Sequence, residues 1–303
     1  MDSVVTSTKV TVSIATRNRA DSLRAVLEAM TRLRNPEGFK WEILVVNNAC
    51  TDHTSQVVAA AQQRLPVREV TEERPGLSHA RNRSIQEAAG EIIAFTDDDC
   101  LVDPDWLTSI VDAFRVEPDL DGLGGRVELH DPRDQPVTIR TYRQRIPLTS
   151  TGQLFALIPG CNMAFRRRVF DSVGLFDWHL GAGAPGASAE DVDMAYRCLR
   201  AGLKVVYLPQ ILVHHAHGRR TDSQVRALHR NYRIGRGAFY CKWILAGERE
   251  VARMMMREAR DLLLLATRTM TQGNDPATRH LVHGWHLGLG MLIRTPPIGP
   301  GPG

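Results

Sequence analysis

Cysteine is scarce in this chain, and its spacing argues against several kinds of site. The 303 residues contain five cysteines, an odd number, and no two of them form a CxxC pair. A zinc site or a disulfide framework is therefore not expected, and free thiols fit a reducing cytosol. No run of 18 apolar residues and no signal-peptide pattern occur, so we expect a cytoplasmic protein without a spanning helix.

Some nucleotide-binding and hydrolase motifs are missing as well. The chain has no Walker A pattern and no GxSxG, so a P-loop enzyme and an α/β-hydrolase are unsupported. What is present is ordinary globular composition, with 43% hydrophobic and 24% charged residues. The length suits one large α/β domain with an appendage, or two small domains.

Charge of one sign is concentrated in the C-terminal part. Residues 1–218 contain 24 basic and 28 acidic residues, a net −4, whereas residues 219–303 contain 14 and 6, a net +8. The basic part suggests an anionic contact: a diphosphate, a phospholipid surface or an acidic acceptor. A solvated helical face explains the charge equally well, and nothing indicates a nucleic-acid partner.

Apolar runs alternate with helical patterns through the first hundred residues. Strands are predicted at 10–15, 41–46, 67–70 and 91–96, and helices at 20–33, 52–61 and 78–89. This order predicts an α/β fold of Rossmann-like type, with a mostly parallel central sheet flanked by helices. Ligands of such sheets lie beyond the carboxyl ends of the strands, where Asn47, Asn48 and the triplet Asp97–Asp99 fall.

The second half of the chain is less regular. We expect a helix capped by Asp103 with Pro104 in its first turn, two short strands at 204–208 and 211–215, and a flexible loop over 181–189. The domain prediction is a catalytic domain over residues 1–218, a basic helical extension over 219–294 and a disordered tail over 295–303.

The strongest chemical signal is the segment IIAFTDDDC. An apolar strand delivers three carboxylates to its end, where they repel one another and lose hydration. A divalent cation removes this cost, and carboxylate oxygens suit Mg²⁺ or Mn²⁺. The alternative is an exposed acidic turn that caps the next helix, a role that Asp103 already fills.

Three weaker signals accompany the triplet. Glu190 and Asp191 follow the glycine-rich loop, where a carboxylate can act as a general base, although acidic residues are common in a first helical turn. His215 and His217 of VHHAH would share one face of a strand and offer metal ligands, or be ordinary buried histidines. Arg81 in RPGLSHARN suits a phosphate, although a surface arginine is the default.

Taken in order, these segments resemble the family 2 glycosyltransferases, which have the GT-A fold. The matching segments run from about residue 10 to residue 217: VSIATRNRA, EILVVNNACTD, RPGLSHARN, AFTDDDC, GCNMAFRR, FDxxLGAG followed by ED, and HxH. The resemblance implies transfer of a sugar from a nucleotide diphosphate donor to an acceptor hydroxyl, with Mn²⁺ or Mg²⁺ as cofactor. The acceptor would be a glycan, a lipid-linked sugar or a small molecule.

The resemblance also implies a role for each matched residue. Asp191 would be the catalytic base, and Asp99 with His217 and His215 would hold the metal. Contacts to the nucleotide sugar are implied for Thr16, Asn18, Arg19, Asn47, Asn48, Arg81, Asp97, Asp98, Cys161, Asn162 and Glu190.

Two departures from the family pattern affect the substrate. Many relatives have an aspartate that reads the imino proton of uracil where this chain has Asn47, and asparagine discriminates less well. GDP and dTDP therefore stay open beside UDP, which is favoured. The QxxRW signature of processive synthases is absent, which points to transfer of a single sugar with inversion at the anomeric carbon. The alternatives are a sugar-1-phosphate nucleotidyltransferase and a non-catalytic protein that binds a nucleotide sugar or glycan.

The segment over residues 248–271 has the pattern of a basic amphipathic helix. Arg249, Arg253, Arg257 and Arg260 fall on one face, with apolar residues on another. Such a helix can lie at the inner face of a membrane beside anionic lipids. It can equally pack on the catalytic domain or on a second copy of the chain in a homodimer, and soluble helices more often do so.

Overall fold

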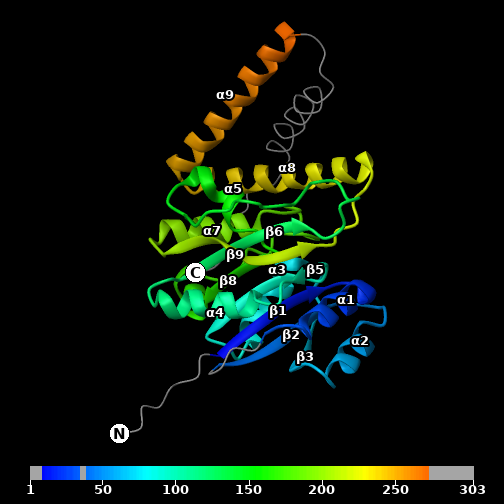
Figure 1. The fold of residues 1–303 in the computed structure, drawn as a ribbon. Coiled ribbons are helices and arrows are strands. Elements are labelled where there is room, and N and C mark those ends of the chain that lie inside the picture. The colour runs from blue at the N-terminus through cyan, green and yellow to red at the C-terminus, as the bar shows by residue number, and fades with distance from the viewer. Residues whose placement is uncertain (1–8, 35–38, 273–303) are drawn as a thin grey trace.

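The computed structural model describes residues 9–34 and 39–272, and in this part of the chain one nine-stranded sheet separates two layers of helices (Figure 1). The sheet order is β3-β2-β1-β4-β8-β6-β9-β5, and β7 pairs with β9 at the side. The predicted α/β fold of GT-A type, with flanking helices and a helical C-terminal extension, is confirmed.

The N-terminal half of the sheet is parallel. It consists of β1 (Lys9–Thr16), β2 (Lys40–Asn48), β3 (Val67–Glu72) and β4 (Ile92–Asp97), connected by α1 (Ala20–Met30), α2 (Thr54–Ala61) and α3 (Leu77–Glu87). Parallel strands end at the same edge, so the last residues of β1, β2 and β4 meet there. The carboxylate of Asp52 fixes two helix starts at this edge, because it accepts hydrogen bonds from the backbone amides of Ala20 and Thr54.

The C-terminal half of the sheet is mixed. Here β8 (Asn162–Arg166) runs antiparallel to β4 and to β6 (Gly122–Leu129), while β9 (Val205–His215) is parallel to β6 and antiparallel to β5 (Cys100–Val102) and β7 (Ile146–Pro147). The two short strands predicted over 204–215 form the single strand β9. Its register against β6 shifts between Gly125 and Arg126, and this irregularity lies beside Pro209, the break visible in the sequence.

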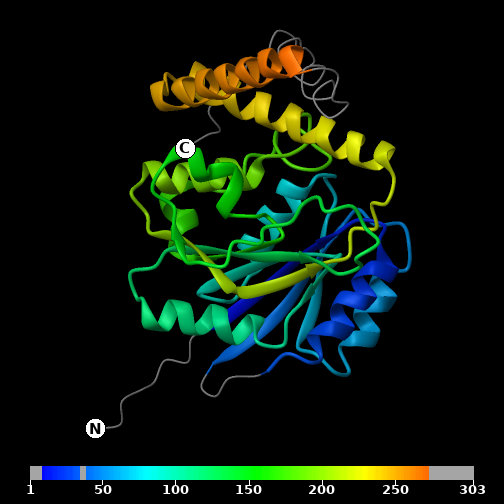
Figure 2. The same cartoon turned by 45° about the horizontal axis from the view of Figure 1, so that its top comes forward.

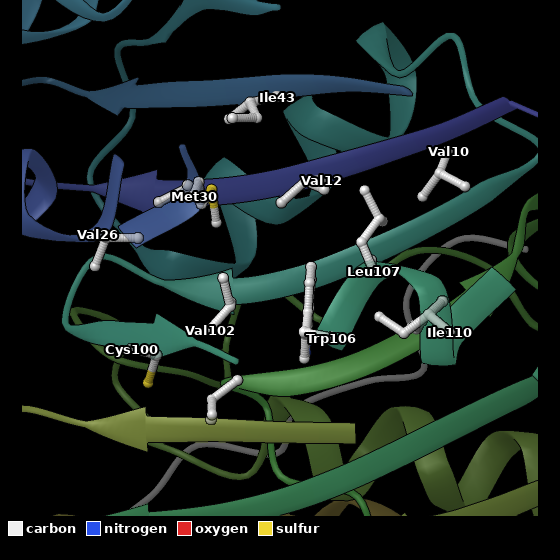
Figure 3. Close-up of a cluster of buried hydrophobic side chains, with 14 of the residues drawn as sticks. Val10, Val12, Val26, Met30, Ile43, Cys100, Val102, Trp106, Leu107 and Ile110 are labelled. Atoms are coloured by element: carbon white, nitrogen blue, oxygen red, sulfur yellow. The ribbon is translucent and has the colours of Figure 1, made fainter. Parts of the chain in front are cut away.

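Each face of the sheet carries its own apolar core. On one face, alternate residues of β1 such as Val10 and Val12 pack with α1, α2 and α4 (Trp106–Val116), and Figure 3 shows Trp106 at the centre of this cluster. On the other face lie α3, α5 (Leu154–Leu157), α6 (Arg167–Val173) and α7 (Glu190–Arg200). The alternation of side chains along each strand produces the two layers.

The start of α4 differs from the sequence prediction. The helix begins at Trp106, two residues later than the cap at Asp103 predicts, and the side chain of its N-cap residue Asp105 makes no capping hydrogen bond. The Asp103 carboxylate instead accepts from the Asp105 amide at 3.0 Å and forms a turn before the helix. Asp103 therefore stabilises the turn before the helix and does not cap the helix itself.

The described part of the C-terminal segment is helical. After η1 (Thr151–Gln153) and the strands of the sheet, α8 (Asp222–Leu245) starts with a capping box of Thr221 and Gln224, and α9 (Arg249–Gln272) follows after a short turn. Figure 2 shows both helices on the opposite side of the sheet from α4. No described helix is long and apolar enough to cross a bilayer. The predicted tail at 295–303 lies outside the described residues.

Candidate active site

A cavity of about 540 Å³ opens at the edge where β1, β2 and β4 end. One side, here called the strand-end wall, is formed by Thr16, Arg19, Asn48 and Asp97–Asp99. The opposite side, the helix wall, is formed by Arg140, Phe155, Leu228, Asn231, Tyr232 and Arg236. Of the residues predicted from the sequence, the cavity collects Thr16, Arg19, Asn48, Arg81, Asp97, Asp98, Asp99, Cys161, Glu190, Asp191 and His215.

The three carboxylates of the triplet have different partners. Asp98 accepts from the Thr16 hydroxyl at 2.7 Å, and Arg19 lies 3.3 Å from Asp98 and 2.9 Å from Asp99. Burial raises the pKa of Asp98 to about 7 and also raises that of Asp97. Burial acts the same way on Asp99, but hydrogen bonding to His215 and the charge of Arg19 outweigh it and hold its pKa well below the usual range.

Arg81 joins the triplet to the segment around Glu190. Its buried guanidinium lies 3.3 Å from Asp97, 2.7 Å from Glu190 and 2.9 Å from the Gly160 carbonyl. Burial and the neighbouring Asp191 raise the pKa of Glu190 to about 7 even though Arg81 opposes this. Arg81 is therefore a buried residue that links three segments of the site, and the expectation of a surface arginine is wrong.

Asp191 is held by main-chain donors, whereas its neighbour Glu190 contacts Arg81. Its two carboxylate oxygens accept from the amides of Gly160 and Val192, each at 2.8 Å. Both residues line the cavity, but Glu190 is buried against Arg81, whereas Asp191 is half-buried. The loop before this pair contains Gly181, with φ +97°, where a Cβ would lie 2.9 Å from the Ser78 hydroxyl. The glycine thus permits the close approach that places the two carboxylates.

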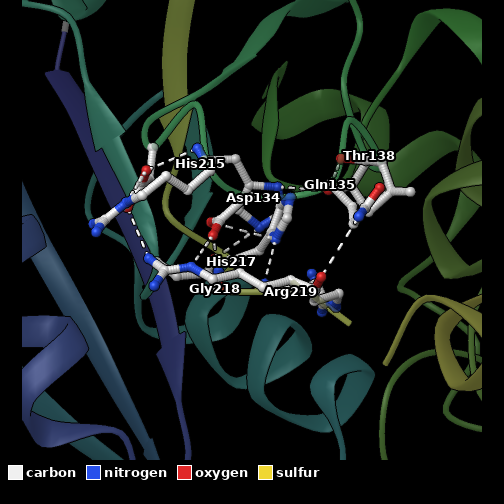
Figure 4. A network of polar contacts seen from close by, with 12 residues as sticks. Asp134, Gln135, Thr138, His215, His217, Gly218 and Arg219 are labelled. Atoms are coloured by element: carbon white, nitrogen blue, oxygen red, sulfur yellow. Dashed lines mark hydrogen bonds and ion pairs between the residues drawn. The ribbon is translucent and has the colours of Figure 1, made fainter. Parts of the chain in front are cut away.

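The two histidines of the HxH segment take different positions, as Figure 4 shows. His215 ends β9, and its Nε2 lies 3.2 Å from Asp99, which raises its pKa to about 9 against the opposing effect of burial. His217 lies beyond the strand, where its Nδ1 accepts from the Arg219 amide at 2.9 Å and lies 3.7 Å from Asp134. Its Nε2 is buried and has no hydrogen-bond partner among the described residues.

Four predicted residues do not line the cavity: Asn18, Asn47, Asn162 and His217. Asn162 is fully buried, where its amide accepts from the Trp106 indole and donates to the carbonyls of Arg126 and Ile211. Asn47 donates to Glu69 at 2.7 Å. These hydrogen bonds hold strands and loops of the fold together, while the contacts predicted for these residues with a donor or a metal stay predictions.

Sequence reasoning missed the helix wall. Leu228, Asn231, Tyr232 and Arg236 follow one another at helical spacing, so one face of α8 looks into the cavity. Burial raises the pKa of Tyr232 well above its usual value, and the nearby charge of Asp191 adds to this shift. The spacing of these residues was visible in the sequence, but nothing there indicated which face of the helix meets the sheet.

Comparison with known proteins shows the family of this chain. Residues 8–233 match the family described as Glycosyltransferase like family 2. The chain belongs to this family. It is therefore a glycosyltransferase. The matched range extends from β1 into α8 and includes the strand-end wall and all of the helix wall except Arg236.

Individual relatives are distant. The chain is 28% identical over 245 residues to the glycosyltransferase AglE of Haloferax volcanii, an alignment that covers 78% of this chain and 74% of the relative. It is 25% identical over 163 residues to a glucosyl-dolichyl phosphate glucuronosyltransferase of the same organism, covering 48% of this chain and 49% of the relative.

Solved structures with the same fold include a mannosyltransferase and TarS. The mannosyltransferase PcManGT of Pyrobaculum calidifontis, in complex with GDP-Man and Mn²⁺, superposes with a TM-score of 0.63 at 21% identity and covers 94% of this chain and 82% of that one. TarS 1-349 of S. aureus with UDP-GlcNAc gives 0.57 at 18% identity, covering 75% and 65%. At these identities the likeness shows the fold.

Proposed function

We propose that this glycosyltransferase transfers a single sugar, with inversion, from a nucleotide diphosphate donor bound at the strand-end wall to a hydroxyl acceptor bound at the helix wall. The observation that carries the proposal is the position of Asp191. Both carboxylates of the pair line the cavity, but Glu190 is engaged by Arg81, whereas Asp191 is held by backbone amides. UDP is the favoured nucleotide, with GDP and dTDP as the other candidates.

The strand-end wall has the chemistry of a divalent metal site. The elevated pKa values of Asp97 and Asp98 mean that the surrounding cations do not compensate all three carboxylates. A Mn²⁺ or Mg²⁺ ion would supply the missing positive charge, and the oxygen donors suit it. Asp99, with His215 beside it, would hold the ion. His217 stays a candidate on the family resemblance alone, because its Nδ1 accepts from the Arg219 amide and the proton of the neutral ring then lies on Nε2. When bound, such an ion neutralises the charge that develops on the leaving diphosphate.

Asp191 is the proposed general base. Two backbone amides fix the orientation of its carboxylate, which faces the cavity from the first turn of α7. In this position it can take the proton from an acceptor hydroxyl as that oxygen attacks the anomeric carbon. One displacement inverts the configuration, and a second carboxylate nucleophile is not needed.

The helix wall is the proposed acceptor site. The ring of Tyr232 is 44% exposed although it lies in the cavity, so it offers an aromatic surface on which a sugar ring can stack. Phe155 lies under the guanidinium of Arg236, with 3.9 Å between the Arg236 Cζ and the ring centroid. A relative that acts on a glucosyl-dolichyl phosphate supports a lipid-linked sugar as one acceptor class. The protein would then work at the cytoplasmic face of a membrane.

A thermal-shift panel tests the donor assignment. UDP, GDP and dTDP sugars are each added with and without Mn²⁺, because a ligand that binds the folded state raises the melting temperature by mass action. We expect one nucleotide to stabilise the protein more than the others, and Mn²⁺ to enlarge that shift. Stabilisation that is independent of the metal for every nucleotide would contradict the proposed metal site.

Transfer to an acceptor distinguishes the proposal from its alternatives. A nucleotidyltransferase would release pyrophosphate from a nucleoside triphosphate, and a non-catalytic binding protein would turn over no donor. We expect release of a nucleoside diphosphate that depends on Asp191. Family membership supports the transferase, and no relative supports either alternative.

A further inference from the structure

Two cysteines that are distant in sequence meet beside the carboxylate triplet. Cys100 follows Asp99 directly and pairs in register with His215 across β5 and β9, while Cys161 precedes β8 and lines the cavity. The two Sγ atoms and one ring nitrogen of His215 all lie within 4.8 Å of one another, and all three residues are buried. No spacing motif marks this group, because the fold alone assembles it.

Asp99 completes a set of four donors. Its Oδ1 lies 3.2 Å from the His215 Nε2 and 3.7 Å from the Cys100 Sγ. A tetrahedral Zn²⁺ with bonds of about 2.0–2.3 Å places its ligand atoms roughly 3.2–3.8 Å apart. Both measured distances therefore agree with edges of such a tetrahedron. The three pairs among Cys100, Cys161 and His215 are each no longer than 4.8 Å, so these donors would move closer together around the ion.

Thr138 orients the histidine for this role. The Thr138 hydroxyl donates its one proton to the Val137 carbonyl at 2.6 Å, and its oxygen lies 2.9 Å from the His215 Nδ1 (Figure 4). Because that proton is already used, the hydroxyl can only accept from an Nδ1–H. Without a cation, Nε2 donates to Asp99. In the neutral ring that a cation binds, the proton stays on Nδ1 toward Thr138 and the lone pair of Nε2 is free for the ion. Hydrogen bonds of this kind orient metal-ligating histidines.

We propose that Cys100, Cys161, His215 and Asp99 form a site for a thiophilic divalent cation of the Zn²⁺ class, and that its occupation inhibits sugar transfer. Two sulfur donors disfavour Mg²⁺ and Mn²⁺ and favour Zn²⁺. Binding releases to solvent the two thiol protons and the Nε2 proton that His215 donates to Asp99. The ion would enter from the cavity, past Cys161. The inhibitory part rests on the proposed function, because the bound ion would take Asp99 away from the metal that serves the donor.

Cobalt spectroscopy of the full chain tests the site without any substrate. Co²⁺ added to metal-free protein is expected to give thiolate-to-cobalt charge-transfer absorption and tetrahedral bands at one ion per chain. Cys161→Ser and Cys100→Ser should each abolish the charge-transfer pattern of the two-thiolate site. Cys198→Ser is the matched control, because that buried cysteine lies in the other core, and it should leave the spectrum unchanged.

The result that overturns the site is an unchanged spectrum in both Cys161→Ser and Cys100→Ser, or its loss in Cys198→Ser. Cys100 is completely buried, so its variant is checked for folding by circular dichroism. Cys161 lies at the cavity surface, and its variant decides the matter if the Cys100 variant fails to fold.

Inhibition is measured separately. With Mn²⁺ and donor in excess, Zn²⁺ is expected to inhibit the wild type at concentrations at least about tenfold lower than those that inhibit Cys161→Ser, each relative to its own uninhibited rate. Equal sensitivity would refute the inhibitory role. If the wild type transfers no sugar from any donor, the proposed function fails, while the cobalt spectrum still confirms or refutes the site.

Discussion

The two walls of the cavity are built in different ways. The strand-end wall comes from the ends of parallel strands, whose register brings Thr16, Asn48 and the triplet to one edge. The helix wall comes from α8 and the segment before β8, which meet the sheet only through tertiary packing. The first wall carries a concentration of carboxylates, while the second exposes an aromatic ring and arginines.

The largest effect is expected at the strand-end wall. Asp99→Asn should reduce turnover to about 10⁻³ of the wild-type rate or less, because the loss of metal-derived charge stabilisation is worth several kcal/mol. Nucleotide binding should lose its Mn²⁺-dependent part, measured by titration with the favoured nucleotide diphosphate. Asp105→Asn is the control, since its exposed carboxylate contacts Arg34 outside the cavity. Full transfer in EDTA would contradict this prediction.

The adjacent carboxylates Glu190 and Asp191 lie where the two walls meet, and their substitution should affect different steps. Asp191→Asn should leave donor affinity nearly unchanged and lower the transfer rate by roughly 10²-fold or more, the loss expected for a general base. Glu190→Gln should instead weaken donor binding, because Arg81 loses the partner that holds it at 2.7 Å. Donor titration and single-turnover transfer measure both variants. A collapse of donor affinity in Asp191→Asn would make it a binding residue.

A smaller effect is expected at the helix wall. Tyr232→Ala should raise the acceptor KM by roughly three- to tenfold, the loss of a stacking contact worth about 0.5–1.5 kcal/mol, and leave donor affinity unchanged. His229→Ala serves as the control on α8, because that exposed side chain does not line the cavity. An increase in the donor Kd of Tyr232→Ala would place the nucleotide at this wall and invert the comparison.

The effect on catalysis in solution should be smallest at α9. Val251 and Met254 of its first turns are buried in the core, as the packing alternative predicted, while Leu263 and Leu264 are 66% and 51% exposed. Contact of these leucines and of the arginines with an anionic membrane, or with a second copy of the chain, stays a proposal. Vesicles with acidic lipid at low ionic strength should bind the protein, and Arg253→Glu with Arg257→Glu should weaken this binding.

Two results would decide against a membrane role for α9. One is the absence of vesicle binding even at low salt, where charge attraction is least screened. The other is binding that the arginine substitutions leave unchanged. A molecular mass of twice the chain in solution, reduced by polar substitution of Leu263 and Leu264, would identify the homodimer instead.

The sequence by itself determined the parallel half of the sheet and the residues at its edge. Apolar strands of alternating register, followed by polar residues, specify both the strands and the side chains that end them, so Thr16, Asn48 and the triplet could be placed in one site. The acidic pair at Glu190 and the histidines were also found, because their spacing is local.

Only the tertiary structure decided the rest. From the sequence, Arg81 was expected at the surface, yet packing buries it between Asp97 and Glu190. The group of Cys100, Cys161 and His215 arises from pairing between strands that are distant along the chain. The choice of the α8 face that lines the cavity has the same origin. Local periodicity fixes which residues share a face of an element, whereas the partner of that face depends on how all elements pack together.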